Sequence, residues 1–304
     1  MRERRASFSR FLSALLVFAF VLAGCSANRF LYNRADTFVR WAIDDYVDLT
    51  SEQQRQFDAD LDGLLDWHRR DELSLYREFI VSSLDALEGG VTIDEAVLIS
   101  DAIDEAANRL QVKLVDLLLE SAEGLTDGQI QDFLDELDRR QAEYAQDRLV
   151  RDDITYADDA ADSLQRLAKR LLGRLNDEQK ALIQSRTTEL MRIDRLWHED
   201  RSVWGAKLRT TLESRLPGWQ TEIRALGDTR SEARTPAYVV GIEHNGEVIL
   251  GLLVEVINGR TERQDRRMRR FLDDLIADID ALTAVNVAEA CLLYTSDAAD
   301  ELLG

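Results

Sequence analysis

The chain has 304 residues, of which 45% are apolar, and its 58 Asp and Glu against 38 Lys and Arg give a formal net charge of −20. Such an acidic chain lacks the basic surface that displaces counterions from phosphates, which argues against a nucleic-acid partner. The presence of only two prolines argues against a loop-rich or all-β fold, and two cysteines exclude a disulfide framework. The apolar content is sufficient for a folded core.

Residues 1–24 have the pattern of a lipoprotein signal peptide. Four arginines lie within the first ten residues, and an apolar run follows over residues 11–23. That run is too short to span a bilayer comfortably but suits the core of a signal peptide. It ends in Leu22-Ala23-Gly24-Cys25, which resembles a bacterial lipobox. The alternatives are an ordinary secretory signal followed by a coincidental cysteine, or an uncleaved membrane anchor.

The lipobox resemblance predicts where the protein is located. It implies cleavage between Gly24 and Cys25 and attachment of lipid to Cys25 as the first residue of the mature protein. Ser26 at the next position, where aspartate would favour the inner membrane, implies delivery to the outer membrane. We therefore expect a cell-envelope protein held at the periplasmic face of the outer membrane by the lipid on Cys25, because more than one acyl chain makes anchoring stable.

The next segments, in chain order, have the periodicity of amphipathic helices. Apolar residues recur at steps of three, four or seven, so each segment has one face to bury. The stripes are Phe57, Leu61, Leu64, His68, Leu75 and Phe79; Ala96, Ile99, Ile103, Ala106, Leu110, Leu114 and Leu117; Ile130, Phe133, Leu137 and Tyr144, continued by Leu164, Leu167 and Leu171; Leu190, Ile193, Trp197, Trp204 and Leu208; and Phe271, Leu275, Ile279 and Leu282. We predict an all-α fold, an elongated bundle of long helices forming a single domain over residues 25–290.

Helix starts and stops are marked in the sequence. A capping residue followed three positions later by Gln or Glu forms a capping box, in which each side chain accepts from the other residue's backbone N–H. These boxes begin at Thr50, Thr92, Thr126, Asn176 and Thr261. The predicted stops lie at Gly89-Gly90, Gly124, Gly173, Pro217-Gly218 and Asn258-Gly259.

The segment at residues 238–257 fits two structures. Asn245-Gly246 between β-branched runs is a hairpin signal. The apolar residues of the segment also fit helical spacing, Thr235-Pro236 is a good helix start, and an isolated hairpin among helices is marginally stable. We predict a helix.

Two further segments are interpreted as connections between helices. Residues 151–162 form an acidic run, which is either a solvated helix face or a turn between helices. Residues 227–236 are the best candidate for a long loop.

The dipeptide Trp-His occurs twice, as Trp67-His68 and Trp197-His198. The dipeptides lie at similar distances from their capping residues, which suggests an internal duplication. One interpretation is a two-histidine metal site completed by carboxylates, as in zinc or iron proteins. The other, which we prefer, is a layer of Trp and His in the core of the bundle. We therefore expect no metal and no other cofactor.

Carboxylates crowd the end of the first mature helix. Asp44 and Asp45 there oppose the helix dipole, so we expect them to be solvated or paired with Arg40, Arg69 or Arg70. A catalytic carboxylate pair is conceivable, but acidic residues are too abundant in this chain for the pair to be informative. Since the sequence contains no nucleophile elbow, phosphate-binding loop or CxxC motif, we expect a protein that is not an enzyme.

The C-terminal segment resembles a cloning artefact. Residues 291–301 read CLLYTSDAADE, which matches the in-frame translation of a transposon-end sequencing adapter. The alternative is a genuine C-terminal helix. We predict that residues 291–304 are adapter-derived and carry no function.

The stretch from Trp41 to Tyr76 resembles the N-terminal signature of a family of uncharacterised helical lipoproteins of Gram-negative bacteria. The matching elements are DDYVDLT at residues 44–50, Glu52-Gln53, and WHR at residues 67–69 followed by Glu-Leu. The resemblance implies a helical fold and an envelope location, and no activity. A looser resemblance links the LTxxQ sequences at residues 49–53 and 125–129 to periplasmic stress chaperones.

Two functions remain open from the sequence. The first is a binding, scaffolding or chaperone-like lipoprotein that holds a protein of the periplasm or envelope. The alternative is a periplasmic metal hydrolase that uses carboxylates together with His68 or His198. Bound metal in the purified protein would favour the alternative.

Overall fold

The computed structural model describes residues 27–228 and 234–300. Within these ranges the chain is helical and contains no strand, as the periodicity predicts. The elements are α2 (Ala27–Tyr32), α3 (Ala35–Asp44), α4 (Ser51–Trp67), the π-helix η1 (His68–Glu72), α5 (Leu73–Ala86), α6 (Ile93–Glu123), α7 (Asp127–Arg148), α8 (Asp153–Leu172), α9 (Asp177–Thr187), α10 (Asp194–Ser214), α11 (Trp219–Asp228), α12 (Pro236–Asn258) and α13 (Glu262–Asp300).

The helix boundaries follow the predicted caps. All five boxes form, with the capping side chain accepting from the backbone three residues later and the Gln or Glu side chain accepting in return. The chain leaves its helices at each predicted stop. At Gly90 and Gly173 the backbone takes φ values of 87° and 78°, which glycine adopts without steric cost.

The segment at residues 238–257 is helical, and the hairpin alternative is wrong. Thr235 caps α12 and Pro236 occupies its first position. Asn245 is buried and uses both ends of its amide on Met191, accepting from its N–H at 2.7 Å and donating to its C=O at 2.8 Å. Asn245, which suggests a turn in the sequence, therefore lies within α12 and holds the loop that contains Met191.

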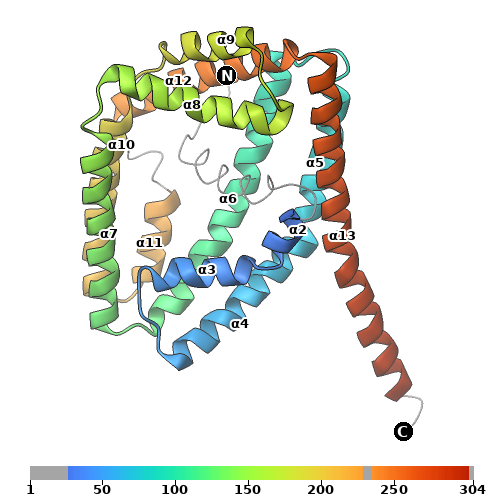
Figure 1. Cartoon of the computed structure of the whole chain (residues 1–304). Helices are drawn as coiled ribbons and strands as arrows, with labels where there is room; N and C mark the ends of the chain where they lie inside the picture. Colours follow the sequence, from blue (N-terminus) through green and yellow to red (C-terminus); the bar gives the residue numbers. More distant parts are fainter. Residues whose placement is uncertain (1–26, 229–233, 301–304) are drawn as a thin grey trace.

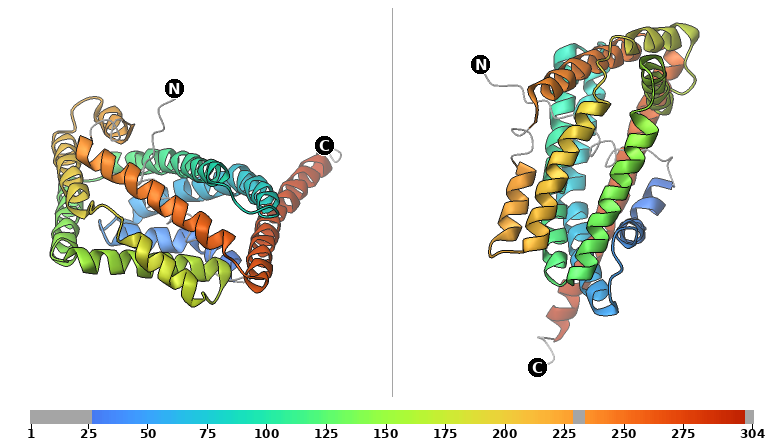
Figure 2. Two further views of the ribbon diagram at one scale, coloured as in Figure 1. Left: turned by 90° about the horizontal axis from the view of Figure 1, so that it is seen from above. Right: turned by 90° about the vertical axis from the view of Figure 1, so that its left-hand side faces the viewer.

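The helices form the sides of an open frame (Figure 1). One side is the pair α7 and α10, the top consists of α8, α9 and α12, and the opposite side is α5 packed on α13. Helices α3 and α4 form the base, and α6 contacts both α4 and α12. Seen from above, α12 crosses between α6 and α9 (Figure 2).

The buried apolar residues divide into separate clusters. The described residues form five such clusters, the largest where α8, α9, α12 and the start of α13 meet. A second cluster joins α6, α7, α10 and α11, and a third joins α2, α5 and α13. Long helices connect these clusters, since α6 contributes residues to three of them.

The capping boxes of α4 and α7 are joined to each other. The amide of Gln53 donates to Gln129 at 3.1 Å, and that of Gln129 donates to Gln53 at 2.8 Å. Each amide also donates to the other helix's incoming loop, Gln53 to the C=O of Gly124 and Gln129 to that of Asp48. This pair of glutamines thus caps the N-termini of both helices and holds the two N-termini side by side.

The same arrangement recurs at the opposite end of the frame. Gln179 of α9 and Gln264 of α13 exchange amide hydrogen bonds of 3.2 and 2.8 Å, both side chains are buried, and Gln264 also donates to the C=O of Arg174. An internal duplication remains a prediction, but the repeated element is this pair of boxes. The Trp-His dipeptides are not equivalent, since Trp67 ends α4 whereas Trp197 lies in the first turn of α10, beyond a break after α9.

Several expectations concern the ends of the chain. The lipobox, with Gly24 and Cys25, lies outside the described residues, as do residues 229–233 of the predicted long loop and residues 301–304. The backbone of residues 291–300 continues α13, which extends past the other helices (Figure 1). None of the helices in the described ranges combines the length and apolar character required to cross a bilayer.

Candidate functional site

A π-helix interrupts the long helix that runs from α4 into α5. It spans His68–Glu72 and follows the buried stripe formed by Phe57, Leu61 and Leu64. A π turn adds one residue to the helical repeat and rotates the following face; such turns are frequent at functional sites. The predicted continuation through Leu75 is therefore wrong, because Leu75 is 45% exposed.

After the π turn, the inward face carries Glu72, Leu73, Tyr76 and Ile80 instead. Glu72 and Leu73 are buried, as is Ile80, and Tyr76 is partly buried. The extra residue thus turns Leu73, Tyr76 and Ile80 inward beside Glu72, which follows His68 by four residues, and turns Leu75 outward. This shift assembles the first polar centre of the fold.

His68 lies at the middle of this centre. The Tyr32 hydroxyl is 2.9 Å from His68 Nδ1, and the ring of Tyr76 meets the imidazole edge-on with centroids 5.5 Å apart. Burial lowers the pKa of His68 to about 4, although Glu72 acts in the opposite direction. Burial also raises the pKa of Tyr32 to about 12 and, together with Glu72, that of Tyr76 above its ordinary value. At neutral pH the imidazole is therefore neutral and both phenols keep their protons.

Glu72 forms the charged part of the centre. Its side chain is 2% exposed and binds the Arg109 guanidinium through two hydrogen bonds, Nε to Oε1 at 2.7 Å and Nη2 to Oε2 at 2.9 Å. This bidentate geometry satisfies the carboxylate and joins η1 to the middle of α6. Because Arg109 remains partly exposed, the pair connects the interior of the fold with its surface.

Trp67 packs beside His68 at the edge of the cluster formed by α3, α4 and α6. Its ring meets the His68 ring at a centroid distance of 6.3 Å, and the Lys113 ammonium lies 5.6 Å from the Trp67 ring. The side chain is partly buried. Trp67 and His68 are thus partly buried at the margin of an apolar cluster.

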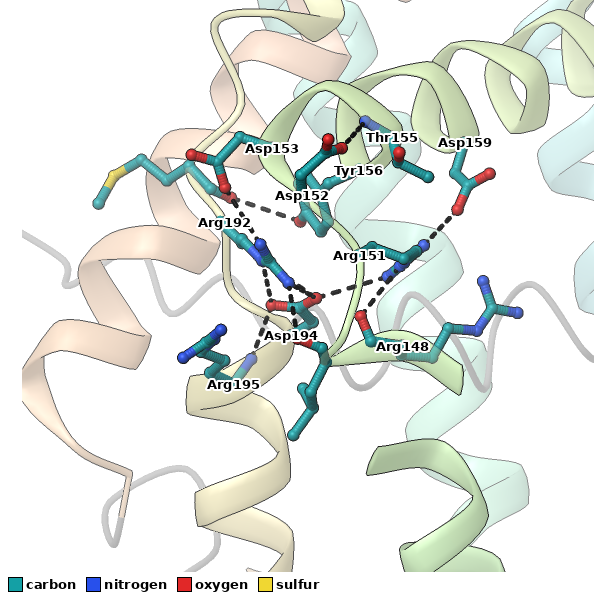
Figure 3. A network of polar contacts seen from close by, with 12 residues as sticks. Arg148, Arg151, Asp152, Asp153, Thr155, Tyr156, Asp159, Arg192, Asp194 and Arg195 are labelled. Atoms are coloured by element: carbon teal, nitrogen blue, oxygen red, sulfur yellow. Dashed lines mark hydrogen bonds and ion pairs between the residues drawn. The ribbon is translucent and has the colours of Figure 1, made fainter. Parts of the chain in front are cut away.

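A second polar centre surrounds Asp194 at the corner where the α7–α8 and α9–α10 connections meet (Figure 3). The buried Asp194 carboxylate accepts from Arg192 Nε at 2.9 Å, from Arg151 Nη2 at 3.5 Å and from the backbone N–H of Arg195 at 2.8 Å. The side chain occupies the first position of α10, where the helix dipole favours a negative charge. Of the two interpretations of residues 151–162, the turn holds for Arg151 and Asp152, which precede α8, and the helix holds for residues 153–162.

The two arginines also enclose Tyr156. Their guanidinium carbons lie 5.5 Å (Arg151) and 5.9 Å (Arg192) from the centre of the phenol ring. Arg192 further donates to the C=O of Leu149 at 3.3 Å and pairs with Asp153 at 3.1 Å (Figure 3). This network fastens two loops to each other, while Asn245 fastens one of them to α12.

The second Trp-His dipeptide lies near this corner but in a different environment from the first. The Trp197 ring packs on Tyr144 with centroids 4.4 Å apart, and the His198 ring stacks on the same tyrosine at 6.2 Å. Arg201 lies over Trp197. Trp67 and Trp197 belong to different clusters, so the structure does not bring the two dipeptides into one layer or one site.

The carboxylates at the end of α3 have other partners than predicted. Asp45 pairs with Arg140 of α7 at 3.2 Å, and Arg40 pairs with Asp58 instead. Arg69 is directed at the Tyr32 ring. Asp44 is exposed. The two carboxylates are thus solvated or paired as expected, and only the named arginine partners are wrong, because the end of α3 lies next to α7, a neighbour that the local sequence does not indicate.

The geometry leaves little room for a metal at either histidine. In the part of the chain that the structure describes, no three side chains of His, Cys, Asp or Glu are grouped to hold an ion. His68 Nδ1 already faces Tyr32, and both oxygens of Glu72 are bound by Arg109. A surface hollow of about 710 Å³ lies elsewhere, between the α5–α6 and α12–α13 turns.

Sequence reasoning missed the structural roles of Glu72, Arg109, Asp194 and Asn245. Glu72 and Arg109 carried a weak signal, since each is a charged residue next to an apolar helix face. Asp194 is one of 58 acidic residues and had no signal of its own. Asn245 was noticed, but as part of a turn motif.

Residues 45–238 match a family described as a family of unknown function (DUF6279). The chain belongs to this family. The matched span of DUF6279 contains both Trp-His dipeptides and, except for Tyr32, the residues of both polar centres, and it ends at Tyr238. Comparisons with curated proteins and with solved structures found no match.

Proposed function

We propose that this DUF6279 protein is a lipid-anchored binding or scaffolding protein of the cell envelope, located at the periplasmic face of the outer membrane. The sequence Leu22-Ala23-Gly24-Cys25 after a basic and apolar leader is the observation that carries the anchoring. The helical frame supplies the binding module, and its partner is a periplasmic or envelope protein or an unfolded client.

The chemistry of the two polar centres supports binding rather than catalysis. The Glu72 carboxylate is bound by the Arg109 guanidinium and that of Asp194 by two guanidinium groups of the same chain, and the Asn245 amide is bound to the backbone of Met191. These groups contribute rigidity to the frame. A rigid support is what a binding surface needs if its side chains are to be preorganised for a partner.

The corner above the Asp194 network offers such a surface. Val150 and Ile154, which flank Arg151 and Asp153, are 76% and 74% exposed. Met191 lies on the adjoining loop and is exposed as well. Exposed large apolar side chains on a rigid support are typical of protein–protein contacts.

Fractionation of a Cys25→Ser variant tests the anchor. The variant should stay in the inner membrane as precursor or be released as soluble protein, whereas the natural chain should fractionate with the outer membrane. Unchanged outer-membrane fractionation of the variant would overturn the proposed anchoring.

Site-specific photo-crosslinking in cells tests the binding surface. A photoreactive side chain at position 154 should give a discrete adduct with one envelope protein. The matched control is position 98 on α6, where Leu98 is 68% exposed. Adducts of the same proteins in equal yield from both positions would show that this corner is not a binding surface.

A further inference from the structure

One corner of this acidic protein is strongly basic. Nine of the 38 Lys and Arg residues fall within residues 166–174 and 263–270, and these two segments contain a single carboxylate, Asp265. Eight of the nine are exposed, namely Arg166, Lys169, Arg170, Arg174, Arg263, Arg266, Arg267 and Arg270. Positive charge is thus concentrated at one place although the whole chain carries −20.

The fold brings the two segments together at the end of α8 and the start of α13. The Gln264 amide of α13 donates to the C=O of Arg174 at 3.0 Å. Arg267 lies so close to Gly173 that a Cβ at this glycine would come within 2.6 Å of Arg267 Cδ. The paired capping boxes of α9 and α13 hold this corner in place.

On α13 the charges occupy one face. Arg263, Arg266, Arg267 and Arg270 follow the spacing i, i+3, i+4, i+7, which places them on the same side of a helix. The buried residues Gln264 and Met268 belong to another face. Asp265 and Arg269 pair with each other on a third side, so this carboxylate is directed away from the basic face.

The basic face is largely without internal counterions. Among the described residues, Arg266 is the member of the set with an ion pair, to Glu262 at 3.5 Å. Arg263 moreover lies in the first turn of α13, where the helix dipole disfavours a cation. Local stability therefore does not account for the positions of these side chains.

We propose that this basic face binds the anionic headgroups of a phospholipid membrane. The inference rests on the proposed lipid anchor and deepens it. Helix α2 begins only two residues after Cys25 and is tied to α13 by the pair Arg29–Asp278 at 3.0 Å. Asp278 follows Arg270 by eight residues, about 12 Å along the helix, so anchor and basic face lie close enough to contact the same membrane.

Lipid attachment and a basic patch complement each other physically. A basic residue near an anionic surface contributes attraction that salt screens, while acyl chains contribute attraction that salt does not affect. The two together would hold α13 against the membrane and orient the frame, so that the Val150 corner is presented in a defined direction.

A vesicle-binding assay tests this inference independently of anchoring. It uses the mature chain from residue 25 onward with Cys25→Ser, so that no lipid is attached. Sedimentation should show binding to vesicles containing phosphatidylglycerol, weak binding to neutral phosphatidylcholine vesicles, and release at high salt. A variant with glutamine at four arginines of the basic face should bind the phosphatidylglycerol vesicles at least about tenfold more weakly. The substituted positions are Arg170, Arg263, Arg267 and Arg270.

A control variant of the same net charge separates the face from overall charge. It carries glutamine at four exposed cations elsewhere on the frame, at Arg55, Arg70, Arg195 and Lys207. The control should bind like the unsubstituted chain, and circular dichroism should show both variants folded. Equal binding to anionic and neutral vesicles, or equal loss in both variants, would overturn the proposal whether or not Cys25 is lipidated.

Discussion

The pH dependence of stability tests the environment of His68 directly. Burial lowers its pKa to about 4 in the folded chain, against the ordinary value of 6.5 that applies once the chain unfolds. Below pH 6.5 the unfolded state therefore binds a proton that the folded state excludes. The contribution of His68 to the free energy of unfolding is therefore complete above pH 6.5 and is lost as the pH falls toward 4.

The size of the effect follows from these two values. At pH 5 the unfolded imidazole is almost fully protonated and the folded one is almost fully neutral. The difference corresponds to about 2 kcal/mol of unfolding free energy relative to pH 8. Many carboxylates also titrate in this range, so the total change of stability with pH does not isolate His68.

A His68→Gln variant isolates the contribution, because glutamine retains polar contacts and does not titrate. Urea unfolding at pH 8 and pH 5 should show that the natural chain loses about 2 kcal/mol more than the variant. The ring of His68 should also titrate well below pH 6 by NMR. Equal losses of unfolding free energy in the two proteins, or a titration midpoint of His68 near pH 6.5, would refute the burial of this side chain.

The other polar and aromatic contacts give three further predictions. Arg109→Met should lower the free energy of unfolding by about 3 kcal/mol, because the buried Glu72 carboxylate loses its counterion. Adding Glu72→Gln to this variant should recover most of that free energy, as measured by denaturant unfolding. A double variant as unstable as the single one would contradict this account. Asn245→Ala should cost about 2 kcal/mol in thermal unfolding, because the backbone of Met191 loses two partners; an unchanged Tm would show that the loop is held by other contacts. Trp67→Ala should lower stability by about 3 kcal/mol while mass spectrometry finds the metal content unchanged, and release of a metal would favour the hydrolase alternative.

Local patterns predicted the helical fold and the capped helix ends, although Leu190 and Ile193 of one predicted stripe lie in the connection between α9 and α10. A capping box involves residues only three apart, and an amphipathic stripe involves neighbours on one helix, so both are encoded where they act. The five starts and the glycine stops of the structure therefore agree with the sequence. The helical state of residues 238–257 also agrees, since Thr235-Pro236 and the apolar spacing outweigh the signal of Asn245-Gly246.

The polar centres depend on contacts between residues that are distant in sequence. Leu73, Tyr76 and Ile80 turn inward because a π turn rotates the helix by one residue, and Arg109, the partner of the neighbouring Glu72, is 37 positions away. A helical repeat read from the sequence assumes a constant rotation per residue, so it continues the stripe to Leu75 and misses the shift.

Leucine spacing and caps by themselves determine that this protein consists of amphipathic helices, and the leader with Cys25 predicts how it is anchored. The tertiary structure decides which helices meet. It joins Gln53 to Gln129 and Gln179 to Gln264, and it gathers the arginines of α8 and α13 on one corner. The physical reason is that an amphipathic stripe specifies how much surface must be buried, whereas contacts between residues distant in sequence, including these hydrogen bonds and charge pairs, specify the partner.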